Sequence, residues 1–187
     1  MMIKVCGITR REDALVASEA GASAIGFIFY PHSPRYIAPE RAAELGEGLD
    51  LWKVGIFVEE SPVTIETVMR AAHLDVAQVY GGAAPVNARV WKAFRVAESI
   101  DGPLGEGAEA LFLDSAKNGA YFDWTLARGA APRVIVAGGL DASNVAEAIR
   151  IAEPWGVDAS SKLESAPGIK DHDKVRAFVK AAREATW

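Results

Sequence analysis

The sequence is poor in the residues that build metal sites and disulfides. It has one cysteine and three histidines among 187 residues. One cysteine cannot form a disulfide within the chain, and a lone thiol is typical of a reducing compartment. The histidines, His32, His73 and His172, lie too far apart for a metal signature, and no His-Glu-x-x-His or paired-cysteine motif occurs. We therefore expect neither a metal site nor an internal disulfide.

Long apolar runs and clusters of basic residues are also missing. No stretch approaches the ~18 apolar residues that span a membrane. Charged residues 10–13 follow the first apolar run too closely for the core of a signal peptide. Twenty Lys and Arg against 25 Asp and Glu give a net charge of −5, without the basic cluster that binds nucleic acid. We expect a cytoplasmic protein that binds neither membranes nor nucleic acid.

Short apolar runs alternate with helix-length segments along the chain. Start and stop signals mark the helices: Thr9 and Glu12 match a capping box, Gly21 a left-handed stop, and Ser61 followed by Pro62 an N-cap. Eight strands are predicted at residues 3–8, 24–29, 53–58, 76–80, 89–96, 110–114, 133–137 and 157–160.

Strands that alternate with helices form a parallel sheet. Eight such units without a linker predict that residues 1–187 form one α/β domain, a single (β/α)8 TIM barrel. Because this barrel typically needs ~250 residues, we expect trimmed or missing helices around strands 4–6. Residues 97–107, rich in Gly, are a poor helix, and residues 82–87 make barely one turn. An open doubly wound sheet is the alternative, but no Gly-x-Gly-x-x-Gly follows any strand.

Polar residues interrupt several of these apolar strands. Alternation places the following pairs on shared faces: Lys4 with Cys6, Gln78 with Tyr80, Lys92 with Phe94, and Phe112 with Asp114. Because helices cover the outer face, we expect these residues and Asp158 to point into the barrel. For the lysines, a structural lysine–carboxylate network is the alternative to a functional role. Cys6 and Asp114 end their strands, where barrels build active sites.

Two regions carry groups that suit anions. Residues 31–36 include two prolines, which stiffen the loop that holds Arg35. A guanidinium fits a carboxylate or a phosphate, and a solvated loop arginine is the alternative. Small residues follow strands seven and eight, where barrels often bind phosphate; a simple turn is the alternative. These residues are Gly138, Gly139, Ser160 and Ser161.

Taken in order, these segments resemble the phosphoribosylanthranilate isomerase family of tryptophan biosynthesis. The resemblance covers nearly the whole chain, and the combination of segments is more specific than any one of them. The matching segments are residues 4–9, 26–29, 33–37, 54–58, 113–114, 122–124, 137–140, 144–145, 156–161 and 164–171.

The resemblance implies an Amadori rearrangement of N-(5'-phosphoribosyl)anthranilate to 1-(o-carboxyphenylamino)-1-deoxyribulose 5-phosphate, without cofactor or metal. It makes Asp114 the general acid, Cys6 the general base and Arg35 the partner of the anthranilate carboxylate. We then expect a raised pKa for Asp114, and for Cys6 a pKa lowered by Lys4 or Arg35. The resemblance also implies substrate-binding roles for Gln78, Tyr80 and Asp158, phosphate-binding roles for Gly138, Gly139, Ser160 and Ser161, and a monomer or homodimer.

The chain departs from the family pattern at three places. Tyr80 stands where the family usually has His, Lys162 replaces the usual Gly after Ser160-Ser161, and residues 115–121 are a shortened segment. The alternative function is therefore a non-catalytic or weakly active phosphate-binding relative. The paired Cys6 and Asp114 argue against it. Sibling barrels that use a Lys/Glu machinery, two Asp residues or metal-binding His fit less well.

Overall fold

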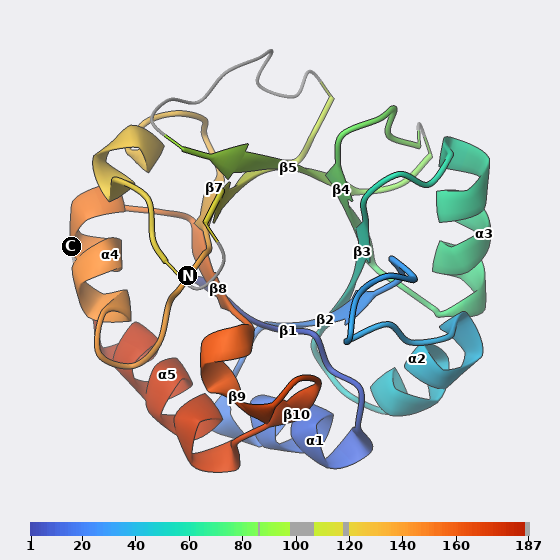
Figure 1. Ribbon diagram of the computed structural model, residues 1–187, viewed down its shortest axis with the longest axis horizontal. Coiled ribbons are helices and arrows are strands. Elements are labelled where there is room, and N and C mark those ends of the chain that lie inside the picture. Colours follow the sequence, from blue (N-terminus) through green and yellow to red (C-terminus); the bar gives the residue numbers. More distant parts are fainter. Residues whose placement is uncertain (86, 98–106, 118–119, 186–187) are drawn as a thin grey trace.

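The computed structural model describes residues 1–85, 87–97, 107–117 and 120–185. Eight parallel strands pair in sequence order, and β1 also pairs with β8, which closes the barrel (Figure 1). This confirms the predicted (β/α)8 architecture. The strands are β1 (Met2–Cys6), β2 (Ala24–Ile28), β3 (Trp52–Phe57), β4 (Val76–Tyr80), β5 (Val90–Val96), β6 (Ala110–Ser115), β7 (Val134–Val136) and β8 (Gly156–Ala159).

Helices surround this ring unevenly. Among the described residues, the connection from β6 to β7 has only the 3-10 helix η1 (Trp124–Ala127), and the connection from β4 to β5 has no helix. The trimming predicted around strands 4–6 is confirmed there, while residues 98–106 of the predicted poor helix lie outside the described residues. The other elements are α1 (Arg11–Ala20), α2 (Pro39–Gly46), α3 (Pro62–Ala71), α4 (Val145–Ala152), η2 (Ser161–Leu163), the hairpin β9 (Glu164–Ala166) and β10 (Ile169–Lys170), and α5 (His172–Glu184).

Most helix boundaries follow the sequence signals. Ser61 Oγ accepts from the backbone N–H of Thr64 at 3.2 Å, and Gly21 ends α1 in the left-handed region. The capping box predicted at Thr9 is wrong, because the N-cap of α1 is Arg10. The Thr9 hydroxyl instead donates to the carbonyl of Gly168, which follows β9. A tertiary contact thus replaces the local one.

Aromatic side chains close the N-terminal end of the barrel. Trp91 lies inside it with its ring centroid 6.1 Å from that of Trp52 and 5.9 Å from that of Trp155. Arg89 and Arg133 cover the outer two rings, and both pair with Glu109. Because this end is filled, a ligand cavity must open at the C-terminal end.

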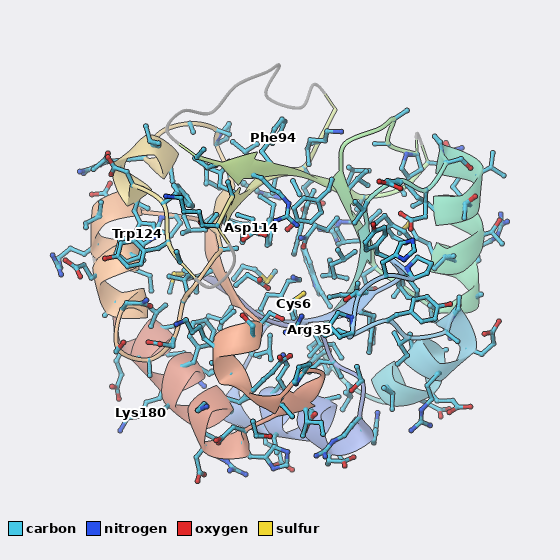
Figure 2. The ribbon with its side chains drawn as sticks, viewed as in Figure 1. Cys6, Arg35, Phe94, Asp114, Trp124 and Lys180 are labelled. Atoms are coloured by element: carbon cyan, nitrogen blue, oxygen red, sulfur yellow. The ribbon has the colours of Figure 1, made fainter. Side chains whose placement is uncertain are left out.

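The interior face of β5 is the opposite of the predicted one. Lys92 and Phe94 do share a face, but it is the outer one: Lys92 Nζ donates to the carbonyls of Gly81 and Gly82, and Figure 2 shows Phe94 outside the ring. The inward positions belong to Trp91 and its alternate neighbours. The closed end needs a large apolar side chain at this level of β5, which Trp91 supplies and a lysine would not.

Candidate active site

One cavity opens at the C-terminal ends of the strands. Its volume is about 380 Å³, within the range of small-molecule sites. All ten residues predicted for the site line it, although they come from six strands or the loops that follow them. They are Cys6, Arg35, Gln78, Tyr80, Asp114, Gly138, Gly139, Asp158, Ser160 and Ser161.

Cys6 ends β1 beside a buried ion pair. Lys4 Nζ lies 2.7 Å from Asp158 Oδ1, and the lysine is completely buried. The predicted lysine–carboxylate network therefore exists. Gly26 leaves room for the thiol, since a Cβ there would lie 2.8 Å from Cys6 Sγ.

The electrostatic setting of Cys6 is different from the predicted one. Burial raises the pKa of the Cys6 thiol, and the positive charge of Lys4 offsets only part of that effect. The expectation of a lowered pKa is wrong, because removing a thiolate from water costs more than one neighbouring cation, itself paired with Asp158, returns.

Alkylation of Cys6 tests this direction. We expect the rate of its reaction with iodoacetamide to rise through a midpoint above that of a free thiol, because only the thiolate reacts. Mass spectrometry of the ligand-free protein between pH 6 and about 11 measures it, with free glutathione as the reference. A midpoint at or below that of glutathione would contradict the argument.

Asp114 lies at the end of β6, across the barrel from Cys6 (Figure 2). Burial raises the pKa of its carboxyl, and a hydrogen bond from Tyr80 Oη to Oδ2, 3.0 Å long, opposes the rise. The raised pKa agrees with the expectation for a general acid.

Gln78 and Tyr80 continue this cluster from β4. Gln78 Nε2 donates to Tyr80 Oη at 3.3 Å. Gln78 Oε1 is buried and has no hydrogen-bond partner among the described residues. Because an unpaired buried oxygen is costly, this atom is suited to accept from a bound hydroxyl.

Arg35 enters the cavity from the loop after β2 with a partner that the sequence analysis missed. Its Nε and Nη2 donate to the two carboxylate oxygens of Glu164, each at 2.7 Å. Lys170 Nζ donates to Glu164 Oε1 at 2.8 Å and to the carbonyl of Ser160 at 3.2 Å. Burial raises the pKa of Glu164, but the hydrogen bonds from Arg35 and Lys170 outweigh this effect and hold the pKa below its usual value. Both missed residues lie within residues 164–171, which could have suggested them.

Small residues form the side of the cavity near β7 and β8. Gly138 has φ +87°, and a Cβ there would lie 2.6 Å from the backbone nitrogen of Ser115, so only glycine fits. Ser160 Oγ donates to the carbonyl of Cys6 at 3.0 Å, which ties β8 to the end of β1. Lys162 also lines the cavity and adds positive charge at this side.

Arg95 is the other missed residue. It lies on β5, lines the cavity, and places its guanidinium 5.6 Å from the ring centroid of Tyr80. Alternation predicted Lys92 and Phe94 inside the barrel, and with that face inside, Arg95 would point outward.

Comparison with known proteins places this site in a family. A sequence model described as N-(5'phosphoribosyl)anthranilate (PRA) isomerase matches residues 3–181. The chain belongs to the phosphoribosylanthranilate isomerase family. Its relative from Solibacter usitatus, named N-(5'-phosphoribosyl)anthranilate isomerase, is 50% identical, with 99% of this chain and 98% of the relative covered.

Solved structures of phosphoribosylanthranilate isomerases have the same fold. The structure from Thermus thermophilus is 35% identical, covers 100% of both chains and has a TM-score of 0.88. Another, 35% identical over 98% of both chains with a TM-score of 0.84, holds reduced 1-(o-carboxyphenylamino)-1-deoxyribulose 5-phosphate. The expected assignment to an isomerase of tryptophan biosynthesis is confirmed.

Within the described ranges, no group of three or more His, Cys, Asp or Glu side chains could hold a metal ion. The same ranges contain no helix that combines the length and the apolar character of a membrane span.

Proposed function

We propose that Asp114 and Cys6 perform the two proton transfers of this isomerase on N-(5'-phosphoribosyl)anthranilate. The observation that carries the proposal is the placement of a partly buried carboxyl and a buried thiol on one cavity, at the ends of β6 and β1. A phosphate-binding module without catalysis has no need of that pair. The Amadori rearrangement needs an acid and a base at separate atoms of the substrate.

The first transfer opens the sugar ring. The protonated carboxyl of Asp114 gives its proton to the furanose ring oxygen as the bond from C1' to that oxygen breaks. The bonding pair goes to the oxygen, and the nitrogen lone pair forms the C=N bond of a Schiff base. The raised pKa of Asp114 favours the protonated form that this step requires.

The second transfer moves the double bond. The thiolate of Cys6 takes the C2' proton, and the electrons of that C–H bond form the C1'=C2' bond as the C=N pair returns to nitrogen. The enolamine then tautomerises to the ketone product. Each positioned proton-transfer group typically contributes ~10²–10⁴ in rate.

The rest of the cavity supplies binding groups. The substrate phosphate would meet the turn at Gly138 and Gly139 and the segment at Ser160 and Ser161, beside Lys162. The ribose hydroxyls would meet Gln78 and Asp158, and the ring of Tyr80 would line their site. Arg35 would meet the anthranilate carboxylate with Nη1, the nitrogen outside its pair with Glu164.

We further propose that residues 1–187 form a single barrel domain of a cytoplasmic enzyme. The pairing of β1 with β8 supports it, because it joins the first and last strands of the barrel in one closed sheet. The Thermotoga maritima relative is described as dimeric, with monomers generated from it; the proposal for this chain is a monomer or a homodimer. A small-molecule substrate is its partner.

Anthranilate-type fluorescence tests the activity. We expect purified protein to accelerate the fluorescence loss of freshly generated phosphoribosylanthranilate by several orders of magnitude over the protein-free decay. Lys180→Met, a change at an exposed position on α5, serves as the control, and the substrate fluorescence should decay as fast with it as with wild type. No acceleration by folded wild type would contradict catalysis and favour the phosphate-binding alternative.

Glu164→Gln tests how Arg35 is held. We expect KM to rise about tenfold with a smaller change in kcat, because the variant loses the anion that orients the guanidinium and neutralises buried Lys170. Steady-state kinetics measures both. Glu44→Gln removes an exposed glutamate paired with Arg41 and should leave both constants unchanged. An unchanged KM in Glu164→Gln would remove Glu164 from this role.

A further inference from the structure

Tyr80 has a partner that a substrate-binding role does not explain. Its hydroxyl accepts from Gln78 Nε2 and lies 3.0 Å from Asp114 Oδ2. A phenol has one proton to donate. With Gln78 on its acceptor side, that proton goes to Asp114. The ring packs edge-on against Phe112, with the centroids 6.4 Å apart, which fixes its orientation.

The two oxygens of Asp114 are therefore in different settings. Oδ2 accepts from Tyr80, while Oδ1 faces Gly138, where an added Cβ would lie only 3.1 Å from it. A neutral carboxyl carries its proton on one oxygen, and the oxygen that accepts the hydrogen bond is better left as the carbonyl. The acidic proton then points from Oδ1 toward the turn at Gly138 and Gly139.

Arg95 on β5 is next to both Asp114 and Tyr80. Its Cα is paired with that of Asp114 in the β5–β6 register, and its guanidinium lies over the Tyr80 ring. Two other charges act on Asp114. Lys4 on β1 lowers the pKa of its carboxyl, as Arg95 does, and Asp158 on β8 raises it. Arg95 and Tyr80 both favour the carboxylate that remains after the proton has left.

We propose that Tyr80 is a positioning residue that holds the transferable proton of Asp114 on Oδ1, and that Arg95 stabilises the carboxylate formed by the transfer. The inference rests on the proposed role of Asp114 as the acid. It gives the Tyr that replaces the usual His of the family a function in this chain, since a phenol donates without titrating near neutral pH.

The pH dependence gives the sign of the test. Asp114 titrates below Cys6, because a carboxyl starts far below a thiol and burial raises both pKa values. The active form has protonated Asp114 and ionised Cys6. The fraction of enzyme in this form rises with pH up to the pKa of Asp114, stays level between the two pKa values, and falls above the pKa of Cys6. The acidic limb thus reports Asp114. Loss of a group that favours its carboxylate moves this limb to higher pH.

Carbon-13 NMR of the aspartate carboxyls in ligand-free protein tests the interaction without relying on activity. Asp114→Asn identifies the resonance. We expect its titration midpoint to move to higher pH in Tyr80→Phe and, independently, in Arg95→Met. The controls Tyr121→Phe and Lys180→Met likewise remove one phenol hydroxyl and one positive charge, at exposed positions, and should not move the midpoint. An unchanged midpoint in Tyr80→Phe would overturn the proposal, and an unchanged midpoint in Arg95→Met alone would remove Arg95 from it.

Kinetics separates positioning from binding. In Tyr80→Phe we expect kcat to fall on the order of tenfold, which is part of the ~10²–10⁴-fold rate contribution of a positioned acid. The acidic limb of the kcat–pH profile should move to higher pH, and KM should stay near wild type. A raised KM with an unmoved limb would overturn the proposal in favour of substrate binding by Tyr80. If the NMR midpoint moves but Asp114→Asn keeps full turnover, the hydrogen bond exists and the proposed role of Asp114 has failed instead.

Discussion

Asp114→Asn is expected to lower kcat by about 10²–10⁴-fold while product affinity stays close to wild type. The amide has nearly the shape of the carboxyl and its oxygen can still accept from Tyr80, but it has no acidic proton for the ring oxygen. Because the change conserves the volume of a partly buried side chain, loss of folding is not the expected cause. Decay of substrate fluorescence gives kcat, and a product titration gives the affinity.

The control for this variant is Asp173→Asn, an exposed aspartate on α5, which should keep full turnover. The pH profile adds a second reading. Without Asp114, the residual rate should follow the ionised fraction of Cys6 and rise with pH across the range in which wild type is level. Wild-type turnover in Asp114→Asn would remove this residue from the acid role.

Cys6→Ser should cause a loss of the same order, about 10²–10⁴-fold in kcat, with little change in KM. Serine nearly preserves the size of the side chain in the space beside Gly26. Its hydroxyl, however, ionises far less readily than a thiol, so almost none of the variant carries an ionised side chain that can act as the base. The fluorescence assay measures the decay of fresh substrate with each protein.

Two outcomes are informative for Cys6. Near-background decay in Cys6→Ser, together with normal product binding, would support the thiolate as the base. Decay at the wild-type rate would exclude it and direct attention to other groups near Cys6, Lys170 among them, whose pKa burial lowers. Ser165→Ala, at an exposed position on β9 outside the cavity lining, is the control and should keep the wild-type rate.

Periodicity in the sequence was enough to predict the barrel. Alternating apolar runs and helix signals located all eight strands, because strand and helix periods depend on local geometry that each segment carries alone. The motifs also identified ten residues that do meet on one cavity, since the carboxyl ends of parallel strands lie at one end of a barrel. The shortness of the chain predicted trimmed helices, and the described residues between β4 and β5 contain none.

Other features required the closed structure. Alternation by two shows which residues of β5 share a face but not which face is inside, so Arg95 was missed until closure placed Trp91 in the core. Arg35, in the loop after β2, pairs with Glu164 on β9, 129 positions away in sequence. Thr9 donates to the carbonyl of Gly168, 159 positions away, instead of capping α1.

The pKa directions depend on the same closure. The residue types alone suggested a thiol activated by cations, but Cys6 is buried beside a lysine already neutralised by Asp158, and burial decides the sign. Residue identity thus determined which groups can exchange protons and where along the chain they stand. Their partners, their burial and the oxygen of Asp114 that carries the proton were decided by folding, because desolvation and hydrogen bonding depend on neighbours that are distant in sequence.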